Sequence, residues 1–119
     1  GAVKKFIYLI SLGQKTESSK IDHLHKPGNN MLHTRLLARL ITKFAPIYAK
    51  VIKEGCDEGV FKVSYPLETA ELLLSSSFMV DVGFFPWDEK TLERRTKAYP
   101  SIIEAQLGAP QNTFKNLKV

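Results

Sequence analysis

The sequence predicts an all-α protein, an antiparallel bundle of about five helices. Apolar residues recur at helical spacing in several segments, and no alternating segment of strand length competes with them. Proline and glycine stand between these segments, at positions where helices commonly begin and end. A chain of 119 residues suits a single domain over residues 1–119, which would bury roughly two thirds of the surface of the unfolded chain.

The first expected helix covers about Val3 to Gln14, and polar residues follow it. The run Lys26-Pro27-Gly28-Asn29-Asn30 then predicts a break, because proline, glycine and asparagine all favour turns. Asn29 or Asn30 is a suitable N-cap for the next helix. The apolar stripe of that helix comprises Leu32, Leu36, Leu37, Leu40, Ile41 and Phe44.

Pro46 interrupts this stripe without ending it, since Ile47, Tyr48 and Val51 continue the same register. Proline removes a backbone hydrogen bond and disfavours helix at the residue before it, so a kink or a brief break is expected near Ala45. One bent helix and two stacked helices both fit the pattern.

Gly59 is the expected end of this segment, because glycine adopts the left-handed turn that terminates a helix while Val60 and Phe61 fold back on its last apolar turn. Pro66 begins another helix, at a first-turn position that suits proline. From Pro66 to Val82 this helix is apolar around nearly its whole circumference and needs cover on both sides. A second copy of the protein is the simplest source of the second cover.

Asp88 is the expected N-cap of the last helix, which extends to Leu107. Pro100 is expected to bend this helix, and Gly108 to end it. Its apolar stripe comprises Leu92, Tyr99, Ile102, Ile103 and Leu107.

The chain carries a net charge of +5, which raises the question of a nucleic-acid partner. Its cations are spread along the first half and around Arg94, Arg95 and Lys97, and no group coincides with a helix-turn-helix pattern. Charge alone indicates solubility and nonspecific attraction. We therefore interpret these cations as solvated helix faces and expect no reading of bases by this chain.

The sequence also limits the compartment. The single cysteine, Cys56, excludes an intramolecular disulfide. No apolar run approaches the roughly 20 residues of a membrane-spanning helix, and the N-terminus lacks the pattern of a signal peptide. We therefore expect a cytoplasmic protein without a membrane partner.

In order and spacing, these signals resemble the C-terminal domain of TetR-family transcriptional regulators. The resemblance covers about Asn30 to Gly108. It rests on Ala45-Pro46-Ile47, on the stop Glu54-Gly55-x-x-Glu58-Gly59-Val60-Phe61, on the Pro66 start with Glu68, Thr69 and Ala70, and on the close Leu107-Gly108-Ala109-Pro110. Tyr65 stands where such proteins often place aspartate, which implies a weaker cap there, with Ser64 as a substitute.

The resemblance implies a bacterial homodimer that acts as a transcriptional regulator, in the first place as a repressor. Two late helices of each subunit would form a four-helix bundle. The interface residues expected on this basis are Leu72, Ser75, Ser76, Met79, Leu92, Tyr99 and Ile103. A small apolar or amphipathic effector would bind each domain and change the separation of DNA-binding domains, which would lie N-terminal to this chain.

The expected effector pocket lies between the Asn30–Asp57 segment, the first helix and the Pro66–Val82 helix. Such pockets are mostly apolar with a few polar groups. The candidate lining residues are His33, Leu36, Leu40, Phe44, Tyr48 and Phe78. Ordinary core packing is the alternative for His33 and for Tyr48.

No pattern predicts catalysis, a metal or a cofactor. His23-x-His25, with His33 nearby, lacks the further ligand that a zinc site needs. Ser75-Ser76-Ser77 lacks the flanking glycines of a nucleophile elbow and a placed base. We therefore expect a protein that is not an enzyme.

Asp81 is a carboxylate in an otherwise uncharged stretch. Pairing with Arg94 or Arg95, or exposure at the helix end, is favoured over a place at the mouth of the cavity. Two rival functions are kept: a free-standing helical carrier of apolar small molecules and, ranked last, a small helical enzyme.

Overall fold

A computed structural model describes residues 1–11, 30–76, 86–115 and 117 of the chain. Within these ranges the structure is helical and contains no strand, so the all-α prediction is confirmed. The helices comprise residues 2–11, α2 (Asn30–Asp57), α3 (Pro66–Ser75) and α4 (Glu89–Leu107). Side chains are described from residue 35 onward in α2.

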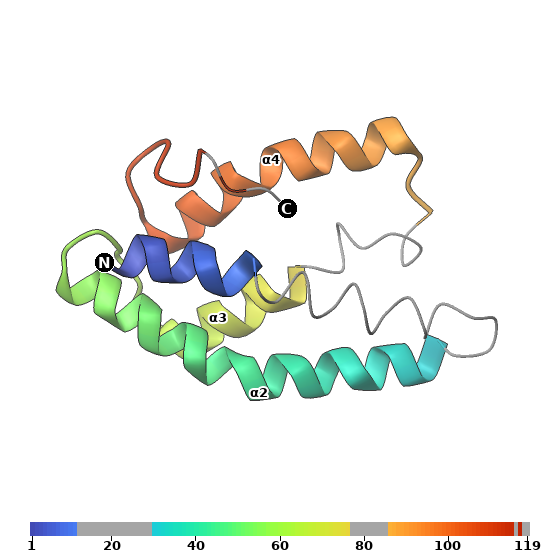
Figure 1. The fold of residues 1–119 in the computed structure, drawn as a ribbon, viewed down its shortest axis with the longest axis horizontal. Helices are drawn as coiled ribbons and strands as arrows, with labels where there is room; N and C mark the ends of the chain where they lie inside the picture. The colour runs from blue at the N-terminus through green and yellow to red at the C-terminus, as the bar shows by residue number, and fades with distance from the viewer. Residues whose placement is uncertain (12–29, 77–85, 116, 118–119) are drawn as a thin grey trace.

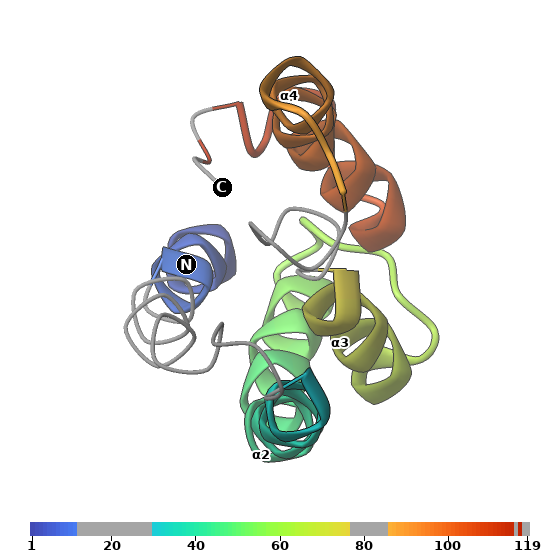
Figure 2. The same ribbon diagram turned by 90° about the vertical axis from the view of Figure 1, so that its right-hand side faces the viewer.

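α2 and α4 are the outer helices of the bundle, and the other helices lie between them (Figure 1). In the end-on view, α2 and α4 lie at opposite edges, with the N-terminal helix (residues 2–11) and α3 between them (Figure 2). α3 packs mainly against α2 and contacts α4 only lightly. α3 is therefore covered well on one side by its own chain.

α2 is one continuous helix, with Pro46 inside it. Of the two arrangements that fit the sequence, the structure has the single helix. The apolar register continues across the proline, since both Ala45 and Ala49 are buried. Figure 1 shows α2 changing direction part of the way along its length, as an internal proline commonly causes.

The end of α2 is the glycine stop that the sequence predicts. Gly59 has a φ of 80°, and its N–H donates to Cys56 O at 3.1 Å. The N–H of Val60 donates to Gly55 O at 2.9 Å, which completes a Schellman motif. Phe61 then folds back so closely that a Cβ on Gly55 would lie 2.0 Å from Phe61 Cδ2. Position 55 therefore requires glycine.

α4 ends in the same way, and the two helix ends join. Gly108 has a φ of 60°, and Ala109 N–H donates to Glu104 O at 2.9 Å. Lys62, just beyond the first stop, donates its N–H to Leu107 O at 2.8 Å. One orphan carbonyl of α4 is thereby satisfied by the segment that follows α2.

Four aromatic rings from distant parts of the chain form the centre of the core. They are Phe6 of the N-terminal helix, Tyr48 of α2, Phe61 and Phe114, and we call them the aromatic junction. The Phe6 ring centroid lies 6.0 Å from Tyr48, 6.2 Å from Phe61 and 5.6 Å from Phe114. Tilted and edge-on rings at these distances attract one another in addition to burying apolar area.

The C-terminal turn is part of this core. Phe114 is fully buried, and Leu117 is nearly so. The buried carboxylate of Glu104 accepts the backbone N–H groups of Phe114 at 2.8 Å and of Asn112 at 3.2 Å. A carboxylate on α4 therefore fixes the turn that delivers the Phe114 ring.

The N-terminal helix is attached to the end of α2 through two carboxylates. Glu58 accepts hydrogen bonds from the backbone N of Ala2 at 3.1 and 3.3 Å, where a negative charge suits the start of a helix. Lys5 Nζ lies 2.7 Å from Glu54 Oε1. The hydrogen bond and the charge of Glu54 raise the pKa of Lys5.

Candidate functional site

The side chains of α3 divide between the core and the surface. Ala70 is fully buried and Leu73 is 8% exposed, because both point toward the core. Leu72, immediately before Leu73, is 70% exposed. A leucine so exposed marks a candidate contact surface.

Hydroxyl groups connect this part of α3 to α4. Ser76 Oγ lies 2.5 Å from the hydroxyl oxygen of Tyr99. The Tyr99 hydroxyl also donates to Leu73 O at 3.2 Å. Two residues that the sequence assigns to the dimer interface, Ser76 and Tyr99, are thereby brought together within one chain.

We define the α3–α4 surface as the partly or largely exposed members of the expected interface. Leu72 and Ser75 lie within a turn of Ser76 on α3, and Leu92 lies two turns before Tyr99 on the same side of α4. The members of the α3–α4 surface are Leu72, Ser75, Ser76, Leu92 and Tyr99.

Two further expected interface residues stand apart from this surface. Ile103 is 1% exposed and packs in the core of its own chain, so it supports α4 from beneath. Met79 lies outside the described residues.

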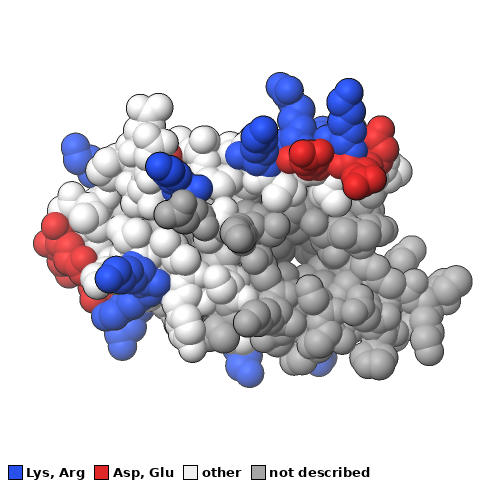
Figure 3. Space-filling view, turned by 45° about the horizontal axis from the view of Figure 1, so that its top comes forward, with Lys and Arg blue, Asp and Glu red and all other residues white. Residues whose placement is uncertain are grey.

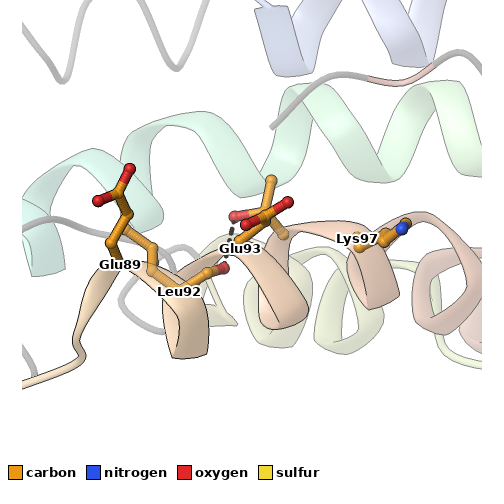
Figure 4. Close-up of a pocket in the computed structure, with 5 residues that line it drawn as sticks. Glu89, Leu92, Glu93 and Lys97 are labelled. Atoms are coloured by element: carbon orange, nitrogen blue, oxygen red, sulfur yellow. Dashed lines mark hydrogen bonds between the residues drawn. The ribbon is translucent and has the colours of Figure 1, made fainter.

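A groove of about 500 Å³ runs along α4 (Figure 4). The described residues that line it are Glu89, Leu92, Glu93, Thr96 and Lys97. It is separate from the effector pocket expected from the sequence, but it contains Leu92 of the α3–α4 surface. Four of its five described lining residues are polar or charged, and Leu92 is the apolar one.

Asp88 holds the start of α4, as the sequence predicts. Its carboxylate accepts the backbone N–H of Thr91 at 2.7 Å. Hydrogen bonds from the Thr91 side chain and backbone lower the pKa of Asp88. The ring centroid of Trp87, the residue before the cap, lies 4.0 Å from the guanidinium carbon of Arg95. The spacing of the sequence does not indicate this contact.

At the opposite edge of the bundle, part of the expected effector pocket forms a second apolar cluster. Leu37 and Leu40 are buried there, with Leu36 and Phe44 partly buried against them. This cluster is separate from the core that contains the aromatic junction. The sequence predicts Leu37 in the apolar stripe of the helix but not among the residues that line the pocket.

Tyr48 takes a different place from these residues. It is 4% exposed within the aromatic junction, and its hydroxyl donates to Leu9 O of the N-terminal helix at 2.8 Å. The side chain of His33 and the whole of Phe78 lie outside the described part of the chain.

Among the described residues, no group of three His, Cys, Asp or Glu side chains could hold a metal ion. His23, His25 and Asp81 fall outside those residues. Cys56 is a half-buried free thiol whose Sγ lies 3.8 Å from Val63 O. None of the described helices is long and apolar enough to cross a membrane.

Residues 14–102 match the family model described as tetracyclin repressor-like, C-terminal domain. No curated protein matches the chain. TetR-like C-terminal domains generally bind effectors and dimerise within transcriptional regulators, and such domains belong to regulators rather than to enzymes. The match covers most of the chain and agrees with its helical fold, so this chain belongs to the family of TetR-like C-terminal domains.

Proposed function

We propose that this chain is the effector-sensing and dimerisation domain of a cytoplasmic TetR-like repressor whose DNA-binding domain precedes it. Two copies pair through the α3–α4 surface of each, so that helices from both subunits form a bundle. An effector then favours one arrangement of the pair over the other. Coupling of about 1–3 kcal/mol between effector and DNA is typical of such linkage.

The observation that carries the proposal is the 70% exposure of Leu72. Apolar burial contributes about 25 cal/mol per Å², so covering an exposed leucine together with the partly exposed Leu92 and Tyr99 favours association. In a two-fold symmetric dimer, both subunits contribute the same surface to the interface. Such dimers are the commonest soluble oligomers.

The test is the mass of the purified chain at micromolar concentration, by sedimentation equilibrium. We expect a dimer, and we expect Leu72→Glu to give a monomer, because it places two like charges in one apolar contact. Tyr8→Glu is the matched control: Tyr8 is 63% exposed on the N-terminal helix, away from the α3–α4 surface. A wild-type monomer, or a Leu72→Glu dimer, would contradict the proposal.

For the effector we propose the second apolar cluster as part of the binding site. It is apolar, it is separate from the main core, and it contains three of the residues expected to line the pocket. Small apolar or amphipathic molecules suit such a lining.

Binding of the amphipathic dye 1-anilinonaphthalene-8-sulfonate tests this assignment. Leu36→Gln should weaken dye binding, because the partly buried Leu36 borders the cluster. Ile47→Gln, which changes a 45% exposed residue of the same helix, should leave binding unchanged. Equal loss in both variants would move the site elsewhere.

A further inference from the structure

One strongly charged surface has no part in dimerisation or effector binding as proposed above. It is a stripe of exposed cations on α2, the helix at the edge of the bundle opposite α4. We call it the basic stripe. Its members are Arg35, Arg39, Lys43, Lys50 and Lys53.

The spacing of these residues places them on one side of α2. At 3.6 residues per turn, all five fall within an arc of about 80° around the helix axis. At 1.5 Å per residue, the stripe from Arg35 to Lys53 is about 27 Å long. The stripe is therefore an extended row of charge along the molecule.

Few acidic groups oppose this row. The only acidic residues of α2 are Glu54 and Asp57, both at its C-terminal end. Glu54 is already paired with Lys5 at 2.7 Å. Within the described residues, no ion pair engages any cation of the basic stripe, and only Lys43 has a ring contact, 5.7 Å from the centroid of Phe44.

The cations of α4 provide an internal contrast. Lys90, Arg94 and Lys97 are exposed too, but Glu89 and Glu93 stand among them. In Figure 3, blue and red side chains lie next to one another over α4, at the upper right of the view. Uncompensated charge is thus concentrated on α2.

We infer that the basic stripe binds the phosphate backbone of duplex DNA without reading its sequence. A duplex carries one negative charge per about 1.7 Å of its axis, a linear array that a linear row of cations complements. A row about 27 Å long exceeds the roughly 12 Å width of the major groove and can reach phosphates of both strands.

An anionic membrane fits the stripe less well. Helices that lie on membranes insert an apolar face below the headgroups. The apolar face of α2 is occupied instead, since Ala45, Tyr48 and Ile52 are buried in the core. The cations of the basic stripe are all exposed, and many protein contacts to nucleic acid are made by such side chains with the phosphate backbone.

The inference concerns this domain's own contact with DNA and depends neither on the effector nor on pairing through α3 and α4. It adds nonspecific affinity that would hold a regulator near DNA. Such binding rests on release of counterions, so its strength falls steeply with salt.

The test is fluorescence anisotropy of a labelled duplex of arbitrary sequence, titrated with the 119-residue chain at several NaCl concentrations. Each neutralised phosphate contributes about 0.9 to the slope of log K against log salt, so five engaged cations give a slope near −4.5 per protomer. Between about 50 and 200 mM salt, affinity should then fall roughly several-hundred-fold.

Two triple variants with the same change in net charge separate the stripe from overall charge. Arg35→Gln, Arg39→Gln and Lys43→Gln together should reduce the slope by about 2.7. Lys90→Gln, Arg94→Gln and Lys97→Gln together should change it by less than one contact, about 0.9. All six residues are exposed, and unchanged far-UV circular dichroism confirms that both variants fold.

Three results would overturn the inference. The first is no salt-dependent binding of the duplex, and the second is an equal loss in both triple variants. The third is tighter, stripe-dependent binding to vesicles of phosphatidylserine and phosphatidylcholine than to the duplex at the same salt. Loss of dimerisation alone would leave the salt slope per protomer as predicted.

Discussion

Leu72 and Leu73 are successive residues of α3, yet one is 70% exposed and the other 8%. The difference follows from what covers each side of the helix, because α3 packs on α2 and meets α4 only lightly. Leucine on the covered side stabilises the monomer. Leucine on the other side is left exposed in the single chain, and the proposed pairing is what would bury it.

The same contrast holds on a larger scale between the aromatic junction and the α3–α4 surface. The junction draws its rings from both ends of the chain, from α2 and from the segment that follows α2, and it is complete within one subunit. The α3–α4 surface keeps apolar and hydroxyl groups half-exposed. Substitutions should therefore act on folding in one region and on association in the other.

The largest effect is expected in the junction. Phe61→Ala should lower the free energy of unfolding by about 3–5 kcal/mol, because it removes a ring that is 2% exposed and contacts two others. Urea denaturation followed by circular dichroism measures this loss. The exposed Tyr8→Ala is the control, with an expected change within about 0.5 kcal/mol. Similar losses in both variants would mean that the junction is not the centre of stability.

The two leucines of α3 give the next effect and the most direct comparison. Leu73→Ala should cost about 2–5 kcal/mol at every protein concentration, since it leaves a cavity against α2. Leu72→Ala should remove mainly the part of the stability that depends on concentration, because that part comes from association. Denaturation curves at two concentrations distinguish them. A concentration-independent loss in Leu72→Ala as large as that of Leu73→Ala would contradict the division of α3.

The smallest effect is expected at Asp88, which caps α4. Its pKa is lowered in the folded state, so the stability it contributes is present above its unfolded pKa, near 3.9, and is lost as the pH falls through the lowered folded pKa. Asp88→Ala should therefore melt below wild type at neutral pH, and the gap should close in acid. Asp88→Asn keeps a capping group without a charge and should show a smaller gap at neutral pH. A gap that does not change with pH would exclude the carboxylate as its cause.

Much of the fold could be predicted because its signals are local. Gly59, Gly108 and the cap at Asp88 act on their own helix ends and stand in the structure as expected. Pro46 left two arrangements open because a local pattern does not show whether packing on both sides holds a helix together.

The contacts that sequence reasoning did not reach are long-range. Nothing local places Phe114 against Phe6, because that contact depends on Glu104 fixing the last turn. For the same reason, the sequence leaves Tyr48 open between a ligand contact and core packing, whereas in the structure its hydroxyl donates to Leu9 O in another helix. Ile103 shares the α4 stripe with Leu92, and only the packed bundle separates its buried position from the surface.

Spin-label distances between subunits give the most direct test of pairing through α3 and α4. With Cys56→Ser as background, a label at Glu71→Cys, next to Leu72, is compared with a label at Tyr8→Cys. Pairing through α3 and α4 predicts a shorter distance between subunits for the label at position 71. A shorter distance at position 8, or no coupling between subunits at any micromolar concentration, would contradict it.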